Sequence, residues 1–127
     1  MTEELPIIDT SSIEEVKETM GDKLPRMFNY FFEDSQSYFN SIENGFNTSN
    51  IDEIINSAHS LKSSSKLIGA LQLSKKAEYI ESAGRRAKTE SSEESFILKV
   101  ENDIQIIRNI LDITHKQYKK YQKENNI

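Results

Sequence analysis

Residues 100–121, VENDIQIIRNILDITHKQYKKY, carry the pattern that decides the fold. Uncharged side chains recur alternately four and three residues apart, at Val100, Ile104, Ile107, Leu111, Thr114, Tyr118 and Tyr121. This spacing places them on one face of an α-helix of about six turns, as in helices that pack along a seam. A helix from Ser92 to Lys123 would be roughly 48 Å long at 1.5 Å per residue. We therefore expect its lysine-rich end to extend beyond the other helices.

Helical periodicity also divides the chain before this segment into four helices. The nearest has a seam of small and apolar residues at Leu73, Ala77, Ile80, Gly84 and Ala87, and the one before it covers residues 51–68 and ends at Gly69. An aromatic helix begins near Pro25 and stops near Gly45, and a short first helix spans residues 12–20. Three pairs predict N-terminal caps, Ser12 with Glu15, Asn50 with Glu53 and Ser91 with Glu94.

The composition agrees with an all-helical fold. Only 4 of the 127 residues are Gly and 2 are Pro, which argues against a turn-rich β structure. We predict an all-α protein, an antiparallel four-helix bundle with a short additional N-terminal helix. The whole chain, 1–127, is expected to form one domain with flexible ends at about 1–9 and 124–127.

Several classes of protein are disfavoured by the composition. The chain has no cysteine, which excludes disulfides and thiolate metal sites. No apolar run approaches membrane-spanning length and the first residues are acidic, so we expect a soluble cytoplasmic protein with no membrane partner. The net charge of −5 and the pI of about 5.1 argue against nucleic acid as a partner.

The segment that suggests chemistry is residues 58–70, AHSLKSSSKLIGA. On a helical wheel His59 lies on the shoulder of the apolar stripe, half exposed, with Lys62 one turn away and small serines on its C-terminal side. A neutral imidazole is a competent nucleophile, and a neighbouring ammonium group would partly neutralise a phosphate. The pattern therefore indicates a phosphoryl group carried on His59. The other histidine, His115, has no such setting and is interpreted as a solvated surface residue.

The same segment resembles a known signature. The string H-x-L-K-x-S-S-x-x-x-G-A, present here from His59 to Ala70, is similar to the motif of histidine-containing phosphotransfer (HPt) domains. The flanking regions resemble the family more loosely over most of the chain. The resemblance implies a four-helix bundle that relays phosphoryl groups in two-component signal transduction, as a phosphoprotein and not as an enzyme with its own ATP site.

The resemblance also implies individual roles. His59 would be the phosphoacceptor, through Nε2, and Lys62 would stabilise the phosphate. Gln36 is the best-placed counterpart of a glutamine that orients the imidazole in some members. Ser63, Lys66 and Gly69 would belong to the surface that docks the partner, Gly69 also ending the helix. Ser63 stands where the family usually has glycine, which puts the closest approach of a partner in doubt.

The family's usual partners are receiver domains of response regulators and of hybrid histidine kinases. Such domains hold phosphate in an acidic, metal-binding pocket, so Mg²⁺ would come from the partner and this chain would need no cofactor or metal of its own. Residues 59–88 contain seven basic and two acidic residues, a local net charge of +5. A basic rim of this kind would assist encounter with an acidic pocket.

Other functions stay open on the sequence alone. The chain has no glycine-rich phosphate loop, so we expect it to take phosphate from another protein and not from ATP. A non-transferring HPt-like adaptor that inhibits a receiver or a histidine kinase remains an alternative, kept open by Ser63. The dimerising bundle of a histidine kinase usually has proline soon after its histidine, and none follows His59 here. We therefore expect a monomer that takes a phosphoryl group from one receiver domain and passes it to another. A generic helical scaffold would not be phosphorylated at all.

Overall fold

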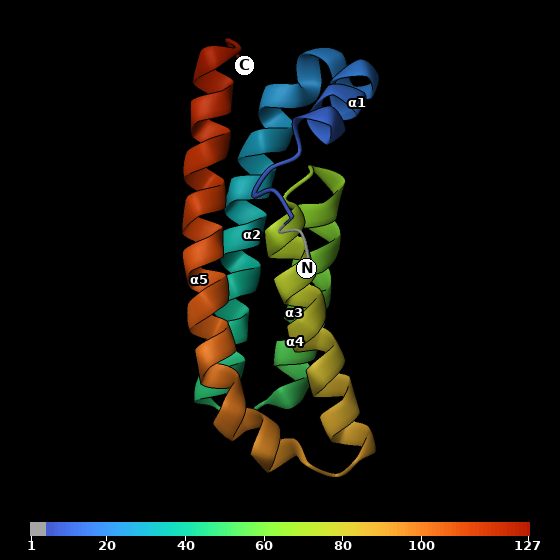
Figure 1. Ribbon diagram of the computed structural model, residues 1–127, viewed down its shortest axis with the longest axis vertical. Helices are drawn as coiled ribbons and strands as arrows, with labels where there is room; N and C mark the ends of the chain where they lie inside the picture. The colour runs from blue at the N-terminus through green and yellow to red at the C-terminus, as the bar shows by residue number, and fades with distance from the viewer. Residues whose placement is uncertain (1–4) are drawn as a thin grey trace.

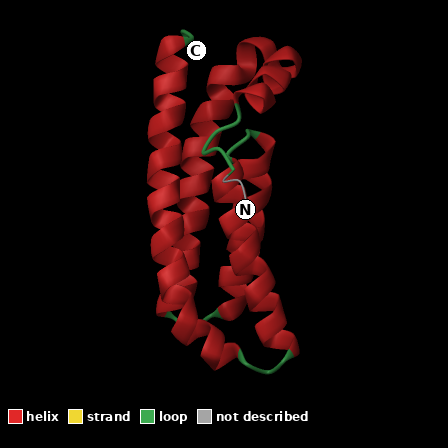
Figure 2. Ribbon diagram, in the orientation of Figure 1, coloured by secondary structure: helices red, strands yellow, loops and turns green. Residues whose placement is uncertain are grey.

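The computed structural model describes residues 5–127 and contains only helices, turns and irregular segments over that range (Figures 1 and 2). Its elements, in chain order, are α1 (Thr10–Met20), η1 (Gly21–Lys23), α2 (Leu24–Asn47), α3 (Ile51–Leu67), α4 (Leu71–Thr89) and α5 (Glu93–Glu124). Helices α2 to α5 run alternately up and down as an antiparallel bundle, and α1 lies across one end of it (Figure 1). The predicted fold is confirmed. Among the described residues, none of the helices is both long enough and apolar enough to cross a membrane.

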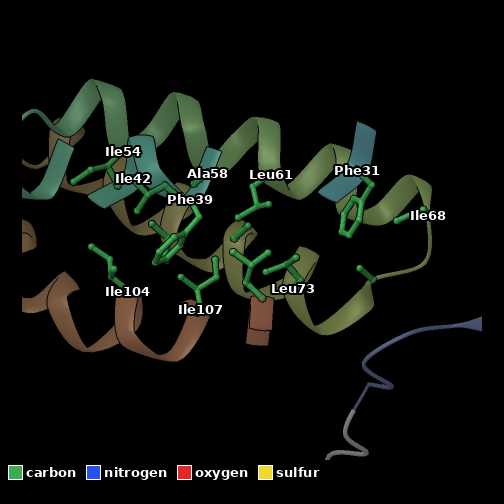
Figure 3. Close-up of a cluster of buried hydrophobic side chains, with 14 of the residues drawn as sticks. Phe31, Phe39, Ile42, Ile54, Ala58, Leu61, Ile68, Leu73, Ile104 and Ile107 are labelled. Carbon is green, nitrogen blue, oxygen red and sulfur yellow. The ribbon is translucent and has the colours of Figure 1, made fainter. Parts of the chain in front are cut away.

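The core lies along the bundle axis and is built from all four long helices. Figure 3 shows its central layer, where aromatic side chains of α2 meet aliphatic side chains of the other helices. Members of this layer are Phe31, Phe39, Ile42, Ile54, Ala58, Leu61, Leu73, Ile104 and Ile107. All are 5% exposed or less, which matches the stripes of the helical periodicity.

Helices α3 and α4 approach each other closely because α4 carries a glycine in its seam. A Cβ atom added at Gly84 would lie 2.7 Å from Cγ1 of Ile55, closer than side-chain carbons pack. The hydroxyl of Ser74 on α4 also donates to the carbonyl of Lys62 on α3 at 2.9 Å. These contacts fix the register of the two helices.

The end of α5 is packed against the bundle, so the predicted overhang is wrong. Tyr118 is fully buried, its ring centroid lies 5.4 Å from those of both Phe28 and Phe31, and its hydroxyl donates to the carbonyl of Ile68 at 2.6 Å. Burial raises the pKa of the Tyr118 hydroxyl, so it stays protonated as a donor. The overhang was predicted from helix length alone, and α2 together with α1 extends the bundle to the same height (Figure 1).

The helix caps agree only in part with the sequence patterns. Asn50 caps α3 as predicted, accepting from the amide of Glu53 at 3.2 Å. Helix α1 is capped by Asp9 and not by Ser12. The residue at the N-cap position of α5 is Ser92 and not Ser91, and its side chain makes no capping hydrogen bond. Of the expected flexible ends, residues 1–4 lie outside the described range. The backbone of residues 5–9 makes hydrogen bonds with Gln72 and Gly69, and Ile127 packs against the core.

Candidate functional site

The site forms on the outer side of α3, where α4 packs beside it. Helix α3 presents His59 with 52% of its side chain exposed, and α4 contributes Glu81, whose side chain is only 7% exposed. The Nδ1 atom of His59 lies 2.8 Å from Oε2 of Glu81. Residues 22 positions apart in the sequence therefore meet through the close contact of the two helices.

Glu81 contacts three residues at once, His59, Lys62 and Arg85. Its Oε1 lies 2.7 Å from Nζ of Lys62, and its Oε2 accepts from Nε of Arg85 at 3.0 Å and from a second guanidinium nitrogen of Arg85 at 2.8 Å. Burial by itself would raise the pKa of Glu81, but the hydrogen bonds from Lys62, Arg85 and His59 outweigh it and lower the pKa to about 2. The carboxylate is therefore ionised at neutral pH.

An ionised carboxylate accepts hydrogen bonds and cannot donate them. The Nδ1 atom of His59 must therefore carry the ring proton, and in the neutral imidazole the lone pair lies on Nε2. With Nδ1 directed at the buried Glu81, the exposed part of the ring is available to solvent and to a partner. The arrangement fixes one tautomer and provides one nucleophilic nitrogen, with two cationic side chains held nearby.

The predicted site residues occupy different surroundings. His59 and Lys62 are joined through Glu81, and Ser63 and Lys66 are exposed on α3. The side-chain amide of Gln36 donates to Asn40 on its own helix at 3.0 Å. Glu81, and not Gln36, therefore contacts the imidazole, and the expectation for Gln36 is corrected.

The expectation that Gly69 lies on the docking surface is also corrected, because the N-terminal segment covers this residue. It is buried, its carbonyl accepts from the amide of Asp9 at 2.8 Å, and an added Cβ would lie 2.7 Å from the Asp9 carbonyl oxygen. Its φ of +84° also favours glycine. Gly69 thus ends α3 and seats the segment before α1, which the sequence pattern could not show.

The sequence analysis missed Glu81 and Arg85 as site residues. A signal was present, because Glu81 follows Ile80 of the predicted seam, and an acid four residues before an arginine in a basic segment favours an ion pair. The sequence did not show that this pair would face His59. Among residues 5–127 no group of three or more histidine, aspartate or glutamate side chains is arranged to hold a metal ion.

Comparison with known proteins identifies the family. The Hpt domain model matches residues 26–111, about two thirds of the chain and including His59, Glu81 and Arg85. The chain belongs to the Hpt domain family. Its role is histidine phosphotransfer in two-component signalling, and members of this family are phosphotransfer carriers, not kinases with an ATP site.

The fold comparison agrees with this membership. The crystal structure of histidine-containing phosphotransfer protein B (HptB) from Pseudomonas aeruginosa PAO1 is similar, with a TM-score of 0.64 and 23% sequence identity. The match covers 91% of this chain and 99% of that one. None of the curated proteins matches the chain significantly.

Proposed function

We propose that this HPt protein accepts a phosphoryl group on Nε2 of His59 from the aspartyl phosphate of one receiver domain and passes it to the aspartate of another. The observation that carries the proposal is the buried, ionised Glu81, whose Oε2 lies 2.8 Å from Nδ1 of His59. This contact keeps the ring proton on Nδ1 and leaves the nucleophilic lone pair on Nε2. In this proposal the protein acts as a monomer in the cytoplasm.

The proposed phosphoryl transfer is a direct displacement at the phosphorus atom. The Nε2 lone pair forms the N–P bond while the bond between phosphorus and the aspartyl oxygen breaks, and the aspartate leaves as a carboxylate with the bonding electrons. The ring keeps its Nδ1 proton and becomes cationic, and the adjacent Glu81 carboxylate stabilises this charge. The second transfer reverses these bond changes on another receiver.

Lys62 and Arg85 have a shared role in this proposal. Both contact Glu81 in the free protein, and Glu81 contacts the ring, so a phosphoryl group bound to the ring would attract both cations. Mg²⁺ would be supplied by the receiver, whose acidic pocket binds it, and the exposed Ser63 and Lys66 would lie at the contact with that pocket.

The test is phosphoryl transfer from ³²P-charged receiver domains of the same organism, with His59→Gln and His115→Gln compared in parallel. The proposal predicts acid-labile, alkali-stable label on the wild type and on His115→Gln, and none on His59→Gln. Label on His59→Gln would disprove the assignment. Binding of receivers without any label on the wild type would favour the inhibitory adaptor.

A further inference from the structure

A separate feature lies on the outer face of α5, the helix at one edge of the bundle (Figure 1). Helix α5 packs against α2 and α4, and α3 packs against the same two helices from the other side. Two large apolar side chains on the outer face of α5 are partly in solvent, Ile106 at 38% and Ile113 at 42% exposed. They are seven residues apart, so they project in nearly the same direction, about 10 Å apart along the helix.

The side chains around these isoleucines are mostly uncharged. Four exposed amide residues share this side of α5, namely Asn102, Gln105, Asn109 and Gln117. The charged residue on this side between residues 102 and 117 is Lys116, which forms an ion pair with Asp112 at 2.9 Å. In a chain of which 29% of the residues are charged, this face can be covered without burying a free charge.

The charges of α5 are separated along its length. Residues 93–103 contain four acidic residues and one lysine, and residues 116–124 contain four lysines and one glutamate. The first segment therefore has a net charge of −3 and the second a net charge of +3. Two such helices placed antiparallel bring the acidic part of each beside the basic part of the other, whereas a parallel pair brings like charges together.

The uncharged positions are also complementary in an antiparallel pair. With a two-fold axis midway between the two isoleucines, Ile106 of one copy lies opposite Ile113 of the second copy, and Asn102 lies opposite Gln117. Apolar side chains therefore meet apolar ones, and amides meet amides. A face that matches itself in both its apolar pattern and its charge fits a second copy of the same chain.

We propose that two copies of this protein associate through the outer faces of α5, antiparallel and related by a two-fold axis near Asn109. The face from residue 102 to residue 117 is only about 23 Å long, so we expect a weak, reversible association with a dissociation constant on the order of 10–100 µM. Below that concentration the protein is the monomer of the proposed function. His59 lies across the bundle from α5 and stays exposed in the pair, so each copy keeps its own site.

The main test is sedimentation velocity of the full chain between about 10 µM and about 1 mM, a range that brackets the expected dissociation constant. It compares Ile113→Glu with Leu67→Glu, which places the same charge on a side chain that is 63% exposed on α3. We expect wild type and Leu67→Glu to form dimers with dissociation constants within about twofold of each other, and Ile113→Glu to associate at least about tenfold more weakly. A wild type that is monomeric throughout, or equal association of both variants, would overturn the proposal.

The charge pairing is tested by mixing two variants. Glu94→Lys with Glu101→Lys reverses the net charge of the acidic part of α5, and Lys120→Glu with Lys123→Glu reverses that of the basic part. We expect each variant alone to associate more weakly than wild type and to gain association with added salt, because like charges then meet. An equimolar mixture should associate more strongly than either variant alone. A mixture no better than its components would overturn the antiparallel charge pairing.

The arrangement is tested by crosslinking, since the chain has no cysteine of its own. Asn109→Cys lies beside the axis and should crosslink to itself through a short bismaleimide. Asn102→Cys alone should not, because its two copies would be about 22 Å apart, but it should crosslink in a mixture with Gln117→Cys. Equal self-crosslinking of Asn102→Cys and Asn109→Cys would indicate a parallel pair and would overturn the proposal.

None of these measurements uses a phosphoryl donor, so their outcome is independent of the proposed function. Urea unfolding shows whether Ile113→Glu remains folded. If it does not, the crosslinks at the exposed amide positions still decide the proposal.

Discussion

The two histidines of this protein have opposite surroundings. His59 is half exposed, and its Nδ1 is bonded to a buried carboxylate, so Nε2 is free. His115 on α5 is half-buried beside Phe31 and Phe32, whose ring centroids lie 5.8 Å and 5.1 Å from its own. The interpretation of His115 as a solvated residue is therefore wrong.

The tautomers also differ. Ser35 donates its hydroxyl proton to the carbonyl of Phe31 at 2.6 Å, so its oxygen accepts from Nε2 of His115 at 2.8 Å. The proton is on Nε2 in His115 and on Nδ1 in His59. Burial, and then the charge of Lys119, lowers the pKa of His115 and keeps this ring neutral. The surroundings of His59 suit the proposed reaction, and those of His115 suit packing.

Of the substitutions that test this comparison, Glu81→Ala is expected to have the largest effect, which is on the rate of phosphoryl transfer. It frees the ring of His59 and leaves Lys62 and Arg85 without their shared acid, so the transfer rate should fall by roughly 10²-fold. Single-turnover transfer from a charged receiver measures this. Glu78→Ala, which removes an exposed acid from the same helix, is the matched control and should transfer normally. Equal rates for both variants would remove Glu81 from the site.

In contrast to Glu81→Ala, the variant His115→Gln should lose stability and keep its rate of phosphoryl transfer. Losing the ring contacts and the bond to Ser35 is expected to cost about 1–2 kcal/mol of unfolding free energy, measured in urea, while the transfer rate stays near that of wild type. His59→Gln should change stability by less than about 0.5 kcal/mol, because the side chain is half exposed. Similar stability losses in both variants would contradict the division of roles.

The stability should also depend on pH through His115. Its folded pKa lies below the unfolded value of 6.5, so the unfolded chain binds more protons in the window below pH 6.5. The contribution of the neutral His115 ring to the free energy of unfolding is complete above pH 6.5 and is lost as the pH falls toward the folded pKa of His115. Urea unfolding between pH 5 and 8 measures this slope. It should be smaller in His115→Gln, and the same slope in both proteins would rule the effect out.

The smallest effect is expected from Lys119→Ala. The ammonium group lies 5.5 Å from the ring centroid of Phe32 and helps to lower the pKa of His115. Its removal should raise the pKa of His115 toward 6.5 and change stability by less than about 1 kcal/mol. An NMR titration of His115 measures this shift.

The sequence predicted what depends on local spacing. The seam from Val100 to Tyr121 defined α5, and Asn50 with Glu53 marked the start of α3. The segment around His59 pointed to phosphotransfer through residues within eleven positions of one another. The cap of α1 was missed because Asp9 and the serines near it fit the same pattern, and packing of the loop selects among them. The side-chain cap predicted for α5 does not form.

Contacts between helices were decided only by the tertiary structure. The rotation and register of neighbouring helices decide which side chain reaches His59, Glu81 or Gln36. They also decide that Asp9 covers Gly69 and that His115 packs against Phe31. Helical periodicity gives the direction of each side chain around its own axis, but it does not fix which helix lies there or at what height. The sequence thus determined the helices and the histidine that we propose to react. Packing of α4 against α3 placed Glu81 beside His59, and packing of the segment before α1 against the turn between them covered Gly69.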